Sequence, residues 1–192
     1  MPRRRIEILA ADCETDPFKI GRIPKPFIWA CYDIYTGRYE TFGSATLFVD
    51  FVRDRRCTVY FHNGGKFDGH YLRPYFNSDQ ELLIINGRIA RFDIGDAEFR
   101  DSYNLIPVAL GKYQKETIDY SIMEEDVRGL PENRTIIERY LKSDCVNLAT
   151  LLRAYFERYG KGLTQAGAAM TDRKSTRLNS SHRSLSRMPS SA

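Results

Sequence analysis

Four acidic residues and one tyrosine lie in three short blocks of this chain. Asp12 and Glu14 belong to the first block, Asp68 to the second, and Tyr140 and Asp144 to the third. Four carboxylates brought together would repel one another unless cations lay between them, and a ligand set made only of oxygen atoms suits Mg²⁺ or Mn²⁺. Two such ions, about 3.5–4 Å apart, stabilise the attacking and leaving oxygens of an in-line displacement. The three blocks therefore predict a metal-dependent nuclease.

The five side chains are expected to divide this chemistry among them. Asp12 is the candidate bridge between the two metal ions, while Glu14 and Asp144 are expected to hold the ion that carries the attacking water. Asp68 is expected to serve the other ion. The phenol of Tyr140 has an ordinary pKa of about 10, so it suits orienting that water by a hydrogen bond better than deprotonating it.

The first two blocks are predicted to follow strands. Residues 6–11 form a short apolar run that is typical of a buried strand, and this strand would deliver Asp12 and Glu14 to the same side of its end. Residues 58–62 predict a second such strand, which a glycine turn connects to a helix near residues 67–75. The second acidic block would then lie at the start of that helix.

The third block is predicted to lie on a long helix over residues 133–158, which Gly160 would end. Tyr140 and Asp144 are one helical turn apart and therefore share a face. Together the elements predict an α/β fold, a mixed sheet flanked by helices. The other expected elements are strands over 27–35 and 38–42, a helix over 45–54 capped by Ser44, a hairpin of 82–85 and 89–94 about Asn86-Gly87, a strand over 98–101 and a short helix over 107–113.

Composition is that of a globular protein rather than a disordered one. The chain has 192 residues, of which 42% are hydrophobic and 12% aromatic, enough for one buried domain. No apolar run approaches the roughly 20 residues of a membrane span, and the amino terminus lacks an apolar signal core, so an intracellular protein without a membrane partner is expected. The four cysteines form no Cys-x-x-Cys pair and are expected to be reduced and structural (Cys13, Cys31, Cys57 and Cys145).

The chain is expected to divide into a domain over residues 1–170 and a disordered tail over residues 171–192. The tail holds five of the 29 basic residues and one of the 25 acidic ones, so residues 1–170 contain 24 of each and have no net charge. Affinity of the domain for DNA would thus come from local patches and metal ions. The stretch 173–182 also looks like translated sequencing-adapter sequence, so the tail is interpreted as an assembly artefact.

The three blocks resemble the exonuclease motifs of the DEDD class with tyrosine, as found in family B DNA polymerases. The closer resemblance is to protein-primed members from phages, viruses and linear plasmids, whose second motif is similar to residues 60–69 with a spacer one residue shorter. The likeness covers about residues 5–170. It implies a ribonuclease-H-like fold and 3′→5′ proofreading hydrolysis of single-stranded DNA ends. It also implies a location in the host cytoplasm, or in a mitochondrion if the source is a linear plasmid.

The resemblance further implies which residues hold the single-stranded 3′ end. They are Thr15 of the first motif, Asn63 and Phe67 of the second with His62 beside them, and Ser102 of an Asp-Ser block. Stacking of Phe67 on the terminal base would contribute about 1–3 kcal/mol. The ring could instead anchor its helix in the core. His62 and Asn63 could likewise satisfy backbone groups at the strand end.

A further short block, residues 115–120, resembles one in which a lysine contacts the scissile phosphate and a tyrosine assists. Lys115 and Tyr120 are the matching residues. A positive group there would offset the charge that builds up on the phosphate. An ordinary surface lysine is the alternative interpretation.

The resemblance also implies partners and a missing part. The family's polymerase module (palm, fingers and thumb) lies after the exonuclease domain, and nothing after Met170 matches it, so the chain is expected to be a fragment without polymerase activity of its own. A terminal, priming protein is a possible partner besides the DNA. Two alternatives remain open: a free-standing DEDD exonuclease on DNA or RNA, and a truncated, inactive module that binds single strands or the priming protein.

Overall fold

The computed structural model describes residues 6–80, 82–109, 117–162, 164, 165 and 167. Within these residues, seven strands form one mixed sheet in the order β3-β2-β1-β4-β7-β6-β5. Their bounds are β1 Glu7–Thr15, β2 Pro26–Asp33, β3 Tyr39–Phe42, β4 Cys57–Phe61, β5 Leu83–Ile85, β6 Arg88–Ile94 and β7 Ala97–Asp101. The mixed α/β architecture predicted from the sequence is therefore present.

Strand β1 occupies an interior position with a neighbour on each side. It pairs antiparallel with β2, with Asp12 opposite Ala30, and parallel with β4, with Ala11 opposite Phe61. Strands β4 and β7 continue the parallel part of the sheet. Because parallel strands end at the same edge, the ends of β1, β4 and β7 bring together segments far apart in the sequence.

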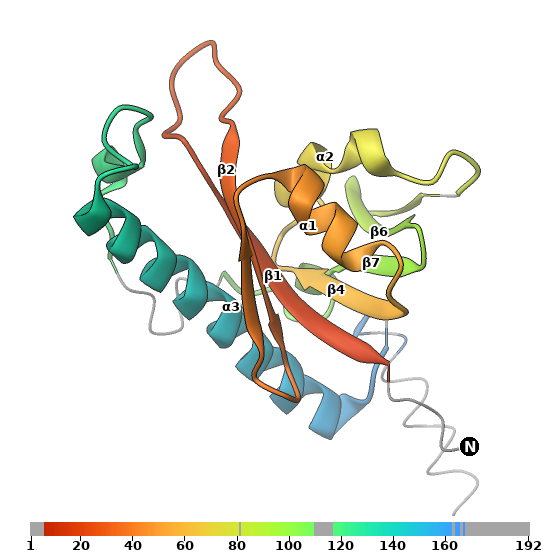
Figure 1. The fold of residues 1–192 in the computed structure, drawn as a ribbon. Helices are drawn as coiled ribbons and strands as arrows, with labels where there is room; N and C mark the ends of the chain where they lie inside the picture. Colours follow the sequence, from red (N-terminus) through yellow and green to blue (C-terminus); the bar gives the residue numbers. More distant parts are fainter. Residues whose placement is uncertain (1–5, 81, 110–116, 163, 166, 168–192) are drawn as a thin grey trace, which may run out of the picture.

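Helices cover both faces of the sheet (Figure 1). Helix α1 (Ala45–Val52) and the short α2 (Asp68–Tyr71) lie on one face, and the long α3 (Pro131–Tyr159) crosses the other. The expected cap of α1 is present, since the Ser44 hydroxyl accepts a hydrogen bond from the Leu47 amide at 3.2 Å. Helix α3 ends at Gly160, whose φ of 75° is a left-handed conformation that glycine adopts without strain.

The side chains of β1 alternate between the two layers of the core. Cys13 belongs to the apolar cluster beneath α1, together with Trp29 and Phe48, whose rings stack with centroids 5.5 Å apart. Ala10 faces the opposite way and packs with Leu148 of α3. Residues of even number in β1 therefore face α3, which decides the direction in which the first acidic block projects.

Several sequence predictions need correction. Strand β1 continues to Thr15 instead of ending at residue 11, so the acids of the first block lie inside the strand. The helix expected over residues 67–75 is only α2 followed by a 3₁₀ turn, η1 (Arg73–Tyr75), because Pro74 has no amide hydrogen with which to continue an α-helix. Residues 107–109 of the helix expected over 107–113 are not helical, and residues 110–113 lie outside the described part.

Two large apolar side chains of the helices are exposed. Leu47 of α1 and Ile136 of α3 have exposed fractions of 57% and 37%. The hairpin prediction is confirmed, since Asn86 and Gly87 both have positive φ between β5 and β6, as a type I′ turn requires. The four cysteines are buried and free, as expected. Among the described residues, no helix is both long enough and apolar enough to cross a bilayer.

Candidate functional site

Three of the predicted acids converge on the α3 side of β1. Asp12 and Glu14 project from the strand, and Asp144 projects from the helix that crosses it. One carboxylate oxygen of each lies within 4.8 Å of the others. Glu14 and Asp144 are buried and Asp12 is partly buried. We call these three residues the acid cluster.

Tyr140 lies one turn before Asp144 on the same face of α3, as the spacing predicted. Its ring is 3% exposed and packs with Leu141 and Ile137 against β2. Its hydroxyl lies 3.3 Å from the hydroxyl of Tyr120, which begins the 3₁₀ turn η4 (Tyr120–Met123). Tyr140 and Tyr120, which belong to separate motifs, are therefore in contact beside the acid cluster.

Asp68 is not one of the three converging carboxylates. Its Oδ1 accepts a hydrogen bond from the Cys13 thiol at 3.0 Å. Cys13 points to the α1 side of β1, whereas Asp12 and Glu14 point to the α3 side. Asp68 thus contacts β1 on its α1 side, by way of Cys13, which lies between Asp12 and Glu14 in the sequence.

Burial governs the electrostatics of this contact. Burial raises the pKa of Asp68 to about 6, an effect that the hydrogen bond from Cys13 partly offsets. The pKa of the Cys13 thiol is itself raised well above its ordinary value, first by burial and then by the charges of Asp68 and Asp12. The thiol therefore remains protonated and serves as the donor of the bond.

The donor set fits a hard divalent cation. The acid cluster offers only carboxylate oxygens, the ligand type that Mg²⁺ and Mn²⁺ prefer. Three negative groups this close, two of them buried, also carry a repulsion that a cation would remove. The described residues Asp12, Glu14 and Asp144 could accordingly hold a metal ion.

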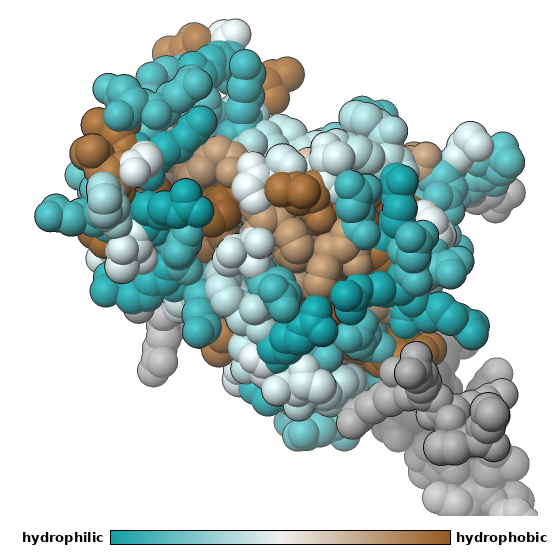
Figure 2. Space-filling model, viewed as in Figure 1, coloured by the Kyte–Doolittle hydropathy of each residue, from teal (hydrophilic) through white to brown (hydrophobic). Residues whose placement is uncertain are grey.

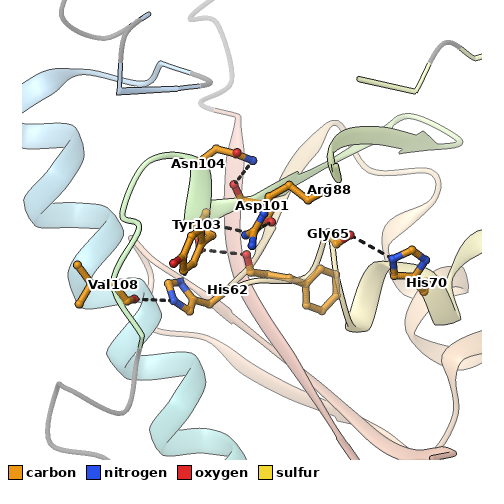
Figure 3. Close-up of polar contacts among 10 residues, drawn as sticks. His62, Gly65, His70, Arg88, Asp101, Tyr103, Asn104 and Val108 are labelled. Atoms are coloured by element: carbon orange, nitrogen blue, oxygen red, sulfur yellow. Dashed lines mark hydrogen bonds and ion pairs between the residues drawn. The ribbon is translucent and has the colours of Figure 1, made fainter. Parts of the chain in front are cut away.

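The loop of the second motif is packed tightly against the neighbouring strands. A Cβ placed on Gly65 would lie 2.2 Å from the Ile89 carbonyl oxygen and 2.9 Å from Asp101 Oδ2, so only glycine fits there. The carbonyl oxygen of Gly65 accepts hydrogen bonds from the Ile89 amide and the His70 ring (Figure 3). Asn63 has a φ of 64° at the start of this loop. Strand β6 therefore fixes the path of the loop.

His62 is held between two elements. Its Nδ1 lies 3.0 Å from the Ser102 hydroxyl and its Nε2 lies 2.9 Å from the Val108 carbonyl oxygen, the latter contact being drawn in Figure 3. Ser102 is fully buried and donates its own hydroxyl hydrogen to the Phe61 carbonyl at 3.0 Å. In this conformation His62 forms a hydrogen bond with the Val108 carbonyl group. Ser102 supports the end of β4 through its hydrogen bond to Phe61.

Sequence reasoning missed a buried ion pair behind this loop. Arg88 Nη1 lies 3.0 Å from Asp101 Oδ2, and both side chains are almost fully buried. The guanidinium also lies 4.1 Å from the centre of the Tyr103 ring (Figure 3). The second oxygen of Asp101 accepts from the Tyr103 amide and caps the 3₁₀ turn η2 (Ser102–Asn104). The Asp-Ser pair was visible in the sequence, but nothing local marked Arg88 as its partner.

The remaining residues that were predicted to contact the DNA differ in how exposed their side chains are. Thr15 ends β1, directly after the acid cluster, and its hydroxyl donates to the Asp16 carbonyl at 3.1 Å. Phe67 is 50% exposed, so its ring is not a core anchor and is available for stacking. Tyr120 is 54% exposed. Lys115 lies outside the described residues.

A cavity of about 550 Å³ lies near the acid cluster, since Ile28, which lines it, pairs with Glu14 across β1 and β2. It opens between β2, β3 and the amino-terminal part of α3. None of the proposed catalytic acids lines it. Its walls include Phe27, Phe42, Arg128, Arg134 and Glu138.

The fold is similar to that of part of a solved DNA polymerase. Phi29 DNA polymerase complexed with primer-template DNA and incoming nucleotides superimposes with a TM-score of 0.73 at 20% identity, over 90% of this chain and 34% of that one. Phi29 DNA polymerase complexed with single-stranded DNA gives 0.68 at 19% identity, over 87% and 34%. The expected α/β class, a mixed sheet flanked by helices, is thereby confirmed. No protein-family model matches the chain.

The sequence gives the particular relationship. The chain is 39% identical over 184 residues to the DNA-directed DNA polymerase of Enterobacteria phage PRD1, covering 91% of this chain and 32% of that protein. The chain is therefore a relative of the protein-primed family B DNA polymerases, as its motifs predicted. It spans about a third of the length of the curated relative that it matches.

Proposed function

We propose that this chain is a 3′→5′ exonuclease that removes nucleotides from single-stranded DNA ends, the proofreading activity of a DNA polymerase. The observation that carries the proposal is the convergence of three carboxylates from β1 and α3 within 4.8 Å. Tyr140 lies one helical turn before the third of them. A site of this composition suits hydrolysis of a phosphodiester better than binding alone, because unneutralised carboxylates repel a polyanion.

The metal requirement is part of the proposal. Two divalent ions, Mg²⁺ or Mn²⁺, would supply charge stabilisation for the attacking and leaving oxygens. Asp12, Glu14 and Asp144 would hold them, with Asp68 contributing from the far side of β1. The hydroxyl of Tyr140 would orient the attacking water, with its own position fixed by Tyr120.

The substrate would be held by residues at the same edge of the sheet. The exposed ring of Phe67 would stack on a base, and Thr15 and Asn63 would contact the strand near its 3′ end. His62 and Ser102 would act by supporting these groups, given their internal hydrogen bonds. Lys115 would neutralise charge at the scissile phosphate.

The wider context is proposed from the relatives. The solved Phi29 polymerase chains are complexed with primer-template or single-stranded DNA, which supports single-stranded DNA as the partner here. A terminal protein is a second proposed partner, in keeping with protein priming. DNA synthesis is proposed for the whole polymerase, of whose length this chain spans about a third. We also propose an intracellular location for this protein.

The proposal is tested on the full chain with a 5′-labelled single-stranded oligodeoxynucleotide in Mg²⁺, in Mn²⁺ and in EDTA. The expected result is a ladder that shortens from the 3′ end, depends on the metal and is lost in Asp12→Ala/Asp144→Ala. Asp50→Ala is the matched control, since Asp50 is an exposed acid on α1 and its removal should leave the ladder unchanged. The same oligonucleotide made as RNA separates a DNA exonuclease from one that accepts both.

Equal degradation by the wild type and the double variant would show a contaminating nuclease and would remove support for the proposal. Binding of the oligonucleotide without any shortening in either metal would favour the binding-module alternative. Both results are read from the same gel and a parallel anisotropy measurement.

A further inference from the structure

The loop between β1 and β2 (residues 16–25, here the β1–β2 loop) exposes three large apolar side chains. Phe18, Ile20 and Ile23 have exposed fractions of 77%, 107% and 80%. In Figure 1 the loop projects beyond the end of the sheet, and Figure 2 shows hydrophobic surface at that end of the molecule. Such a set of apolar side chains on one loop marks an interaction site more often than single exposed residues do.

The loop has a specified shape rather than a loose one. Asp16 is 2% exposed, and its carboxylate accepts a hydrogen bond from the Lys25 amide and pairs with Arg22 across the loop. Its own amide donates to the Lys25 carbonyl at 3.1 Å, which closes the base. At the tip, the Arg22 amide donates to the Lys19 carbonyl, and Gly21 takes the positive φ that this tight turn needs.

An ion pair fixes the loop against the wall of the proposed site. Lys19 Nζ lies 2.8 Å from Glu124 Oε2, directly after the turn η4 that carries Tyr120. The loop also begins only two residues after Glu14, about 7 Å at the rise of a strand. Its tip is then roughly 20 Å of chain from the acid cluster by the same rise. The apolar side chains therefore stand along a path that leads to the cluster.

The charge of the loop favours nucleic acid as the occupant. Three basic residues and one acid lie within residues 16–25, whereas residues 1–170 as a whole contain equal numbers of each. The basic side chains of Lys19 and Arg22 remain 49% and 42% exposed despite their ion pairs. Alternating basic and apolar or aromatic groups are typical of surfaces that hold single strands, where bases contact the rings and phosphates the cations.

We propose that the β1–β2 loop is a second contact surface for single-stranded DNA, which binds the bases several nucleotides before the 3′ end. This inference rests on the proposed exonuclease function for its substrate. Phe18 would stack on a base, while Ile20 and Ile23 would cover neighbouring bases. Lys25, Arg22 and Lys19 would face the phosphates.

The test compares the full chain with the triple variant Phe18→Ala/Ile20→Ser/Ile23→Ser on oligothymidylates of three and twelve nucleotides. A stacked trinucleotide spans about 10 Å, too short to reach the tip, whereas twelve nucleotides extend well past it. The expected result is a KM for the twelve-nucleotide substrate raised about five- to a hundredfold, the range that base–aromatic contacts supply, with the KM for the trinucleotide changed far less. The matched control is Ile84→Ser, an exposed residue on the edge strand β5.

A separate binding measurement distinguishes failure of this inference from failure of the proposed function. Fluorescence anisotropy of labelled dT12 in EDTA reports affinity without turnover, so it remains informative if the wild type has no nuclease activity. Weaker binding by the triple variant than by Ile84→Ser supports the loop surface. Unchanged binding, an equal KM rise for both substrate lengths, or loss of self-association in place of loss of DNA binding would overturn it.

Discussion

Tyr140 has a structural part, its ring, and a proposed catalytic part, its hydroxyl group. Its ring is part of the core between α3 and β2, and its hydroxyl contacts Tyr120 beside the acid cluster. Tyr140→Phe keeps the ring and removes the hydroxyl, so kcat should fall on the order of 10²-fold, the lower end of the range for a positioned proton-handling group. The free energy of unfolding should change by only about 0.5–1.5 kcal/mol, the net contribution of one hydrogen bond.

Steady-state kinetics and urea unfolding of the same preparation measure the two effects. Tyr120→Phe is the companion variant, because it removes the other hydroxyl of the pair from a residue that is half exposed. A Tyr140→Phe protein with wild-type kcat would contradict the orienting role.

Asp68 illustrates the opposite case, a residue that lowers stability. Its pKa is raised by burial from 3.8 to about 6, so the folded state binds this proton more tightly than the unfolded chain does. In metal-free buffer the ionised group therefore lowers the free energy of unfolding above pH 6, and the loss is recovered as the pH falls toward 4. Asp68→Asn should raise the free energy of unfolding at pH 7.5 by up to about 3 kcal/mol and have little effect at pH 4.

Urea unfolding in EDTA at the two pH values measures this difference. Asp50→Asn on the surface of α1 serves as the control and should show no such dependence. An equal gain for Asp68→Asn at both pH values would mean that the carboxylate charge is not the cause. Nuclease activity should fall in the same variant, since stability and function compete at such sites.

At the scale of elements, the loop of the second motif depends on the strands behind it. Gly65 is pressed against Ile89 and Asp101, so Gly65→Ala must displace the loop or β6. The variant should lose about 1–3 kcal/mol of stability, as overpacked sites do, and should lose activity because Phe67 moves with the loop. Thermal unfolding and the exonuclease assay measure both.

Gly43→Ala is the matched control, because a Cβ at Gly43 would meet no atom within 4 Å. Its stability should stay within about 0.5 kcal/mol of the wild type. If Gly65→Ala were as stable as the wild type, the tight packing around Gly65 would not restrict the loop, and the prediction would be wrong.

The elements differ in how well local sequence predicted them. Strand β1 and helix α3 were predictable because their periodicity and their stop signal at Gly160 lie within the segments themselves. The turn η4 and the ion pair that holds the β1–β2 loop against it were not predictable from local sequence. They depend on partners such as Lys19 and Glu124, which are 105 residues apart. The hydrogen bond between Cys13 and Asp68 was unpredictable for a related reason, because it depends on which layer each side chain of β1 faces.

In the molecule as a whole, the net positive charge and the proposed catalytic site lie in different parts of the sequence. Residues 171–192 hold five basic residues and one acid, whereas residues 1–170 have no net charge. A chain ending at residue 170 should therefore bind single-stranded DNA with a weaker salt dependence. The slope of log K against log salt should decrease by up to about 3, at roughly 0.7 for each phosphate neutralised. Anisotropy titrations between 50 and 200 mM salt, about the range over which such contacts are lost, measure this slope.

The shortened chain should keep the exonuclease rate of the full chain at the higher salt concentration. An identical slope for both chains would mean that the basic residues of the tail do not contact the DNA.

The interior position of β1 has a consequence for how the protein would lose activity on heating. Its backbone is bonded on both edges, to β2 and to β4, whereas β3 and β5 are the outermost strands and can fray. The amide hydrogens of residues 9–11, the part of β1 that is paired with both neighbours, should accordingly exchange with solvent only when the entire sheet opens. Thermal inactivation should then coincide with global melting, and a heated sample should contain intact enzyme and unfolded chain without a folded, inactive intermediate.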